Sequence, residues 1–382
     1  MTDLSTGVDR EPVVRVSTLE LFFDLVFVFT VTQLTAVLAG HPDWSTAGRV
    51  VVLLLMIWWM YDGYAWLTNT VAPTDQVRRG LLLLGMFGFL MIALAVPGAY
   101  SGSGWVFGVG YFLVNAIHSG LLLRASPTAM RQLAPLNLLS AGLVLAGGIV
   151  TGPWRVGLWV AAIAVMAVSP YLHPLSEWSI SSAHFVERHG LIVIIALGES
   201  VVAIGAGAAG LELTPARLGV AGLGLVLSFL LWWLYFGGDD VKAEHALDSV
   251  PSARRGRTAL HAFGWAHVPL LLGVVVFAAG VKKAVVYAGG HLYPAYALLL
   301  AGGVAIFLLG DVLFRYFLCI GSRRYRLIGA FAVLATVPIG LASTVAQLGA
   351  VALLLVAVIT VEAHRTPSPD PASTAAPAAP VH

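Results

Sequence analysis

Long apolar segments follow one another along almost the whole chain, and only a bilayer can cover so many of them. A helix that crosses the hydrocarbon core needs about 20 mostly apolar residues. The chain is 59% hydrophobic and 10% charged, with a mean hydropathy of +0.88, whereas soluble domains carry about 25% charged residues. We therefore predict an all-α integral membrane protein with about twelve transmembrane helices. The candidate spans are 19–39, 47–69, 80–98, 104–123, 133–151, 154–170, 187–208, 216–236, 261–280, 294–315, 326–345 and 347–362.

The positions of the basic residues predict how the chain threads through the membrane. Cytoplasmic loops are enriched in Lys and Arg. Twelve crossings put both termini on one side, which then holds 16 of the 21 Lys and Arg residues. The other five are Arg49, Arg155, Arg217, Lys282 and Lys283. We therefore expect a multi-pass protein of the cytoplasmic (plasma) membrane with both termini in the cytoplasm.

Composition also limits the partners that the chain can have. A net charge of +2 does not suggest a nucleic-acid partner. The single cysteine, Cys319, excludes an intrachain disulfide and a cysteine-based metal cluster. The histidines show no ligand spacing such as HExxH, since His261 and His267 are six residues apart and face different sides of a helix. We expect the lipid bilayer as a partner and no metal or cofactor, and leave homodimer formation open.

Two pairs of segments indicate an internal repeat. The segment ELFFDLVFVFTVTQLTAVLAG begins at Glu20, and ERHGLIVIIALGESVVAIGAG begins at Glu187, 167 residues later. The next segments contain WWMYDGYAW from Trp58 and WWLYFGGDD from Trp232. Six spans separate the members of each pair, so the halves would run parallel, with pseudo-two-fold symmetry about the membrane normal. We predict a parallel 6+6 repeat in which the first spans of both halves face each other.

The repeat divides the chain into five parts. These are a cytoplasmic N-terminal segment 1–18, a first six-helix repeat 19–170, a cytoplasmic linker 171–186, a second six-helix repeat 187–362, and a disordered cytoplasmic tail 363–382.

Ionisable residues inside the spans gather in the predicted cytoplasmic half. Each costs about 2.5–3.5 kcal/mol at the centre of the membrane, so such residues normally face the protein interior or water. Glu199 is the exception, because twelve residues at about 1.5 Å each put it about 18 Å deep. We predict an inward-facing polar vestibule that narrows toward Glu199. Its candidate transport-pathway residues are Asp24, Asp62, His118, Glu187, His189, Glu199 and His267.

Structural roles compete with this interpretation. Glu20, Arg188 and Arg315 lie within a turn of the surface, where they can reach the headgroups or form structural salt bridges. Asp311 and Arg315 have the i,i+4 spacing of a pair on one helix face. The aromatic residues of the first span and the tryptophans from Trp58 and Trp232 fit helix packing. Alternatively, the first span forms a hydrophobic gate. His184 is expected to be solvated in the loop before the seventh span. Close helix contacts are expected at Gly190, Gly198, Gly205 and Gly207.

The motifs of the first and seventh spans resemble a known family. Glu20-Leu-Phe-Phe23-Asp24, then Glu187-Arg188-His189-Gly190, then Gly198-Glu199-Ser200, resemble the bacterial low temperature requirement A family over about residues 15–362. The resemblance implies a bacterial polytopic membrane protein whose motif residues include Glu20, Phe23, Arg188, Gly190, Gly198 and Ser200.

A second, weaker resemblance concerns the mechanism. Phe23-Asp24-Leu25-Val26-Phe27 is similar to the Phe-Ser-Asp signature on the first helix of the two-repeat endolysosomal potassium/proton channel family. Here Phe22-Phe23-Asp24 replaces that signature and lacks its serine. The resemblance implies six-helix repeats whose first helices line a pore.

Three functions compete at this point. A transporter or channel for a small solute or cation would use proton-titratable Glu199 in its pathway, with Asp24 and Asp62 as inner anions. An integral membrane enzyme acting on a lipid or isoprenoid would use the carboxylates and histidines near the inner leaflet for acid–base work, but no nucleophile motif or Asp-rich diphosphate motif accompanies them. A structural membrane-adaptation protein would not need a buried Glu199. We favour the first, which is not an enzyme.

Overall fold

The computed structural model describes residues 16–70, 75–125, 127–172 and 180–365, and their regular structure is entirely helical. The first half contains α1 (Thr18–Gly40), α2 (Trp44–Thr70), α3 (Gln76–Ala95), the 3₁₀ turn η1 (Val96–Gly98), α4 (Gly104–Ala125), α5 (Pro127–Ile149) and α6 (Pro153–Leu172). The second half contains α7 (Ser182–Ala208), α8 (Pro215–Phe236), α9 (Asp239–Ser249), α10 (Ser252–Ala259), the π-helix η3 (Leu260–Trp265), α11 (Ala266–Val286), α12 (Pro294–Leu318), α13 (Arg324–Leu334), α14 (Val337–Ala342) and α15 (Thr344–Arg365).

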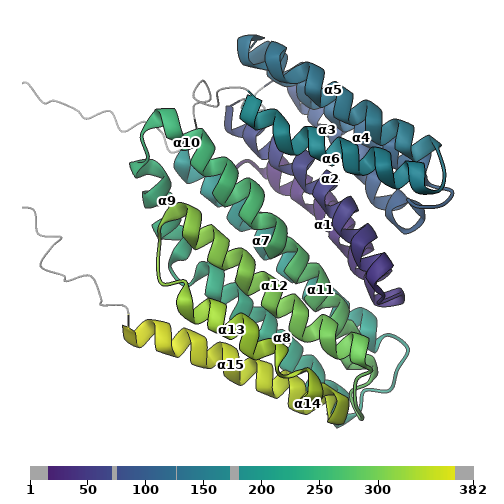
Figure 1. The fold of residues 1–382 in the computed structure, drawn as a ribbon, viewed down its shortest axis with the longest axis vertical. Coiled ribbons are helices and arrows are strands. Elements are labelled where there is room, and N and C mark those ends of the chain that lie inside the picture. Colours follow the sequence, from purple (N-terminus) through teal and green to yellow (C-terminus); the bar gives the residue numbers. More distant parts are fainter. Residues whose placement is uncertain (1–15, 71–74, 126, 173–179, 366–382) are drawn as a thin grey trace, which may run out of the picture.

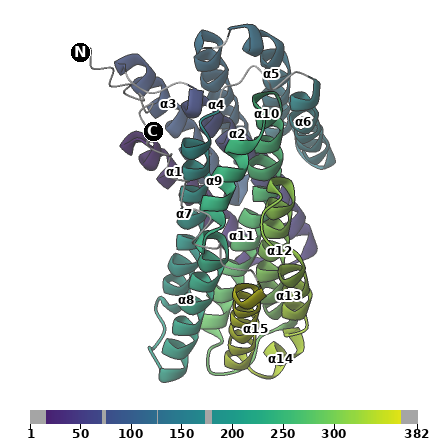
Figure 2. The same cartoon turned by 90° about the vertical axis from the view of Figure 1, so that its left-hand side faces the viewer.

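The two halves form two groups of helices that pack side by side (Figure 1). α1 and α2 of the first half contact α7 and α11 of the second half. Figure 2 shows the second half from the side, with α7 and α8 along one edge and α12, α13 and α15 along the other. The functional residues discussed below lie where the two groups meet.

The neighbours of each helix follow the same order in both halves. In the first half α1 packs against α3, α3 against α4, α4 against α5 and α5 against α6, while α2 contacts α4 and α6. In the second half α7 packs against α11, α11 against α12, α12 against α13 and the α13–α14 pair against α15, while α8 contacts α12 and α15. Each of these contacts in the first half therefore has a counterpart in the second half.

Eleven helices of the described residues are long and apolar enough to cross a membrane. The predicted span 326–345 differs, because it forms two short helices, α13 and α14, with a break at Ala335 and Thr336. Leu292 donates its backbone N–H to Gly340 at the end of α14, beside the loop between α11 and α12. The broken pair therefore returns from the end of α12 to the start of α12, and it replaces the continuous helix that we predicted.

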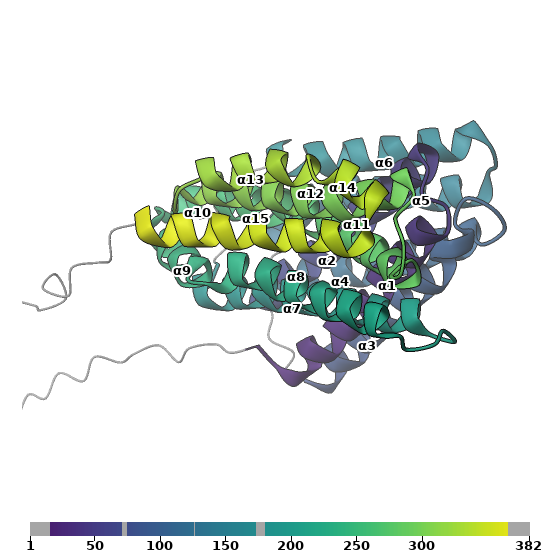
Figure 3. The same ribbon diagram turned by 90° about the horizontal axis from the view of Figure 1, so that it is seen from below.

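α1 begins and α15 ends at the same end of the bundle (Figure 3). This end also carries Asp239 at the start of α9, which contacts α7, and Glu362 near the end of α15. We call it the predicted cytoplasmic end, since the compartment that it faces is a prediction from the positive charges.

Small residues bring α11 and α12 close together. A Cβ atom on Gly303 would lie 2.2 Å from the backbone nitrogen of Phe277, and one on Gly273 would lie 2.4 Å from that of Phe307. No L-residue with a side chain fits at such distances, so glycine permits the contact of the two backbones.

The predicted close contacts on α7 hold in part. A Cβ on Gly207 would lie 2.5 Å from the carbonyl oxygen of Lys282, and one on Gly190 would lie 3.2 Å from the ring of Phe236. Gly198 and Gly205 have nothing within 4 Å of that position. The prediction of close packing was wrong at these two glycines, because the side of α7 on which they lie has no close neighbour.

Two helices extend into the predicted linker 171–186. α6 continues to Leu172 and α7 begins at Ser182. Residues 173–179 of this linker lie outside the described residues, as do residues 1–15 of the predicted N-terminal segment and 366–382 of the predicted tail. α15 itself continues to Arg365.

Candidate functional site

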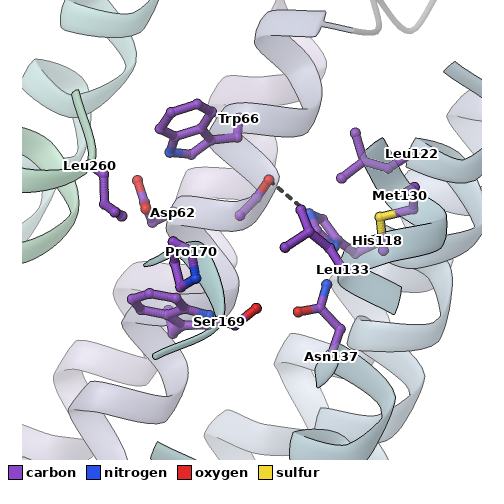
Figure 4. A pocket seen from close by; sticks show the side chains of 12 residues that line it. Asp62, Trp66, His118, Leu122, Met130, Leu133, Asn137, Ser169, Pro170 and Leu260 are labelled. Carbon is purple, nitrogen blue, oxygen red and sulfur yellow. Dashed lines mark hydrogen bonds between the residues drawn. The ribbon is translucent and has the colours of Figure 1, made fainter. Parts of the chain in front are cut away.

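A cavity of about 100 Å³ lies between α2, α4, α5, α6 and η3. Two of the predicted vestibule residues, Asp62 of α2 and His118 of α4, line it together (Figure 4). The remaining lining is mostly apolar or aromatic, with a hydroxyl and an amide. It consists of Trp59, Gly63, Trp66, Leu122, Met130, Leu133, Asn137, Ser169, Pro170 and Leu260.

The orientation of His118 leaves one of its ring nitrogens as an unused hydrogen-bond acceptor. Its Nε2 atom lies 3.0 Å from the carbonyl oxygen of Gly63. Since a carbonyl only accepts, Nε2 donates, and Nδ1 of the neutral ring carries the lone pair. Nδ1 is buried and has no hydrogen-bond partner among the residues that the structure describes. An unused acceptor of this kind is unfavourable unless a donor meets it.

Asp62 is the residue that links the cavity to the second half. Its Oδ1 atom lies 3.0 Å from Nε2 of His189 on α7, and both side chains are buried. Asp62 Oδ2 lies near η3, where a Cβ on Gly264 would approach it to 3.2 Å. A side chain at this position would crowd the carboxylate, so glycine permits the close approach of η3 to Asp62.

The contacts of His189 require one more proton than a neutral imidazole and an ionised carboxylate together carry. Its Nδ1 atom lies 2.8 Å from the carbonyl oxygen of Phe185, and its Nε2 atom faces Asp62. Both ring nitrogens face acceptors, but a neutral ring has a single N–H. Either the ring carries both protons or Asp62 carries one. The pair thus holds one exchangeable proton in the wall of the cavity.

His267 of α11 satisfies its contacts as a neutral ring. Nδ1 donates to the carbonyl oxygen of Ala262 at 3.0 Å, and Nε2 accepts from the hydroxyl of Tyr235 at 2.9 Å. The rings of His267 and His189 lie 5.3 Å apart, and Trp58 stacks on His267 at 6.0 Å. His189, His267 and Tyr235 thus form a row of buried titratable side chains that runs from Asp62 to α8.

Asp24 of α1 forms a second buried ion pair. Its partner is Arg188, which directly precedes His189 on α7. Arg188 Nη1 donates to Asp24 Oδ2 at 3.0 Å, and the hydroxyl of Tyr61 donates to Asp24 Oδ1 at 2.6 Å. Arg188 also lies 3.9 Å from Glu20. Asp24 and Arg188 are at most 1% exposed at their side chains. Arg188 is therefore paired inside the protein and does not extend to the headgroups.

Glu20 has a local structural role as well. It is the third residue of a capping box, in which its carboxylate accepts from the backbone N–H of Ser17 at 2.7 Å. Ser-x-x-Glu before an apolar run is a sequence signal for a helix start, which could have identified this role. His184 lies 3.4 Å from Glu20 and is buried. The prediction of a solvated His184 was wrong, because α7 begins before it.

Glu199 lies deeper along α7, where this helix meets α1. It is 2% exposed and accepts a hydrogen bond from the hydroxyl of Thr32. Eleven residues separate it from Arg188, about 16 Å along the helix axis. The structure thus places Glu199 apart from the Asp62–His118 cavity, at the contact of the first helices of the two halves.

The other predicted residues differ in their surroundings. Glu187 is exposed, unlike its buried neighbours Arg188 and His189, and its place in the predicted vestibule stays a prediction. A helix turns by about 100° per residue, which points adjacent side chains in different directions. Phe23 is a packing residue that stacks on Tyr64 at 5.0 Å. Ser200 is fully buried, and its hydroxyl has no partner among the described residues.

A separate ion-pair cluster closes the predicted cytoplasmic end of the second half. Arg315 binds Asp239 at 2.6 Å and Glu362 at 3.1 Å, while Arg326 binds Asp311 and Glu362. The predicted pair of Asp311 and Arg315 is present at 3.7 Å. The cluster joins α9, α12, α13 and α15, and we interpret it as structural.

The motif residues, the cavity and the ion pairs all lie within one family match. A model of the family described as bacterial low temperature requirement A protein (LtrA) matches residues 15–363. The chain belongs to the bacterial low temperature requirement A family. This LtrA protein is 30% identical over 321 residues to the uncharacterized protein RA0937 of Rhizobium meliloti (strain 1021), and the match covers 77% of this chain and 75% of that protein. No solved structure matches it. The predicted family is confirmed, and the resemblance to the two-repeat channels stays a prediction.

Proposed function

We propose that this LtrA protein is a proton-coupled transporter of a small solute or cation. The observation that carries the proposal is the double position of Asp62, which lines the cavity and shares one proton with His189. A ligand that changes the charge balance at Asp62 changes the affinity of the pair for this proton. Binding and protonation are then coupled, as linkage requires.

The coupling residues lie between the two groups of helices. Asp24 and Asp62 belong to α1 and α2, whereas their partners Arg188 and His189 belong to α7. A movement of one half against the other would break these contacts, and a change of protonation would alter their strength. This arrangement favours alternating access over an open channel.

The corresponding neighbours of the two halves support a parallel 6+6 repeat. Thr32 and Glu199 are 167 residues apart, the same offset that aligns Glu20 with Glu187. Equivalent residues touch where a pseudo-two-fold axis passes between two helices. In our proposal Glu199 therefore lies in the pathway at this axis and controls the contact of α1 with α7 as it gains or loses a proton.

Proton flux into proteoliposomes tests the function. We expect solute-dependent flux between pH 5 and 8, a loss of at least tenfold for Asp62→Asn and Glu199→Gln, and no change for Glu244→Gln. Glu244 is a suitable control because it is exposed on α9. Equal flux in all four proteins, or none in a folded wild-type protein for any solute or cation, would overturn the proposal.

A lipid-modifying enzyme is the second candidate, and the mostly apolar lining of the cavity is the observation that favours it. The cavity combines a carboxylate and a histidine, which acid–base chemistry requires. Turnover of an added lipid without flux would select this function. A purely structural protein would show neither activity, and its Asp62→Asn variant would change stability alone.

A further inference from the structure

The cavity has a carboxylate in its wall. Asp62 lines it, and a carboxylate accepts hydrogen bonds at both oxygens. Oδ1 faces His189, which leaves Oδ2 as the acceptor for a ligand. A carboxylate that faces a cavity favours a ligand with N–H or O–H donors. The negative charge of Asp62 adds a preference for a cation.

The walls of the cavity complement the nonpolar part of such a ligand. Trp59 and Trp66 provide aromatic surfaces, which attract cations through their quadrupole and also pack against rings. Leu122, Met130 and Leu260 provide an apolar lining. About 100 Å³ corresponds to roughly seven to ten water positions. This room suits a single-ring or short-chain molecule.

We infer that the cavity binds a small organic ammonium ion, with N–H donors at one end and an apolar body. Its ammonium group would donate to Asp62, while its body would contact Trp59, Trp66 and the aliphatic lining. Ser169 and Asn137 supply further polar contacts in the same wall. This inference names the substrate class of the proposed transporter and rests on that proposal only for the transport step.

The same geometry makes the ammonium ion and the proton competitors. A protonated His189 neutralises Asp62, and so does a bound ammonium ion. Two cations at one carboxylate repel each other, so binding of the ligand releases the proton of the pair. The ligand would therefore exchange with a proton at Asp62.

Other titratable groups surround the pair of Asp62 and His189 and could contribute to the pH dependence of binding. They are His118 on α4, Asp24 on α1 with Tyr61 on α2 and Arg188 on α7, His267 on α11 with Tyr235 on α8, and His261 on η3 with Tyr171 on α6. His267 and Asp24 have satisfied partners of their own. Asp62 and His189 remain the pair in which one proton must be added to satisfy both contacts.

Four compounds of similar size separate the requirements of the site. Benzylammonium has both the charge and N–H donors, benzyltrimethylammonium has the charge alone, benzyl alcohol has a donor without charge, and benzoate has the opposite charge. Binding to the full-length protein in lipid nanodiscs is measured by calorimetry and by quenching of tryptophan fluorescence. We expect benzylammonium to bind at least tenfold more tightly than each of the other three.

The pH dependence supplies an independent readout. We expect the affinity for benzylammonium to rise by up to about tenfold per pH unit while the pair is protonated, with release of about one proton per ligand. Asp62→Asn should lose both the affinity and the proton release. His245→Gln, at an exposed position of α9, should change neither.

Each outcome decides a separate point. Equal binding of benzoate or benzyltrimethylammonium, or binding without proton release, would overturn the inference. Binding with proton release but without flux in proteoliposomes would retain the ligand class and remove the transport function. Flux of another solute without binding of benzylammonium would retain transport and remove the ligand class.

Discussion

Thr32 of α1 donates a hydrogen bond to Glu199 of α7 across the contact between the two groups of helices. Glu199 is 2% exposed, and a buried carboxylate is costly unless it has hydrogen-bond partners. The hydroxyl of Thr32 is thus part of what makes a charged residue tolerable at this depth.

Thr32→Val removes this hydroxyl without a change of side-chain shape. We expect the free energy of unfolding to fall by about 1–3 kcal/mol, because Glu199 loses a buried partner. Denaturation by SDS in mixed micelles measures the change. The double variant Thr32→Val/Glu199→Gln should recover part of this loss. A variant as stable as the wild-type protein would show that the hydrogen bond contributes nothing.

The buried pair of Asp24 and Arg188 makes a stronger prediction. Asp24→Asn leaves a buried guanidinium without its main counter-charge, so we expect a loss of about 3–5 kcal/mol. Asp24→Asn/Arg188→Gln should lose less than the sum of the single variants, as residues in contact do. Asp248→Asn is the control, since its carboxylate is 72% exposed beside Arg255, and surface pairs contribute at most about 1 kcal/mol. If the losses of Asp24→Asn and Arg188→Gln simply added up in the double variant, this would contradict the pairing.

Arg155 stabilises the opposite end of the first half through carbonyl groups. Its guanidinium donates to the carbonyl oxygens of Gly147, Gly148, Val150, Ala99 and Ser101, and it is 3% exposed. These contacts tie the turn after α3 to the turn between α5 and α6.

Arg155→Met should lower the free energy of unfolding by at least about 3 kcal/mol, because several buried carbonyl groups lose their donor. Arg49→Met is the matched control: Arg49 lies on the same predicted side but is exposed, and we expect a change below about 0.5 kcal/mol. Similar unfolding midpoints for the two variants would refute a clamping role of Arg155.

Most of the fold could be predicted from the sequence because the membrane requires long apolar helices. Eleven of the twelve expected spans form continuous helices. The remaining span, 326–345, is broken at Ala335, before Pro338 in the first turn of α14, and an average over a hydropathy window does not resolve such a break. α7 begins at Ser182 rather than at residue 187. The hydropathy pattern missed this first turn, because it contains the polar residues Ser182 and His184.

The candidate site was predictable in its residues but not in its pairs. Asp24, Asp62 and His189, which the depth count placed within the spans, are buried. The depth count could not join Asp62 to His189, because they are 127 residues apart and their contact depends on the packing of α2 against α7. Depth along a helix also does not show which way a side chain faces, so it could not separate exposed Glu187 from its buried neighbours Arg188 and His189.

The protonation of His189 is the most direct test of the central claim, that this residue and Asp62 hold one exchangeable proton. NMR spectroscopy of the protein with ¹⁵N-labelled histidines, in nanodiscs at pH 7, reports which ring nitrogens carry hydrogen, and His189→Gln assigns the signals. We predict that Nδ1 of His189 is protonated, either in an imidazolium or in a neutral ring beside a protonated Asp62. In Asp62→Asn the ring should be neutral with its hydrogen on Nδ1. A neutral His189 in the wild-type protein with its hydrogen on Nε2 alone would contradict the claim.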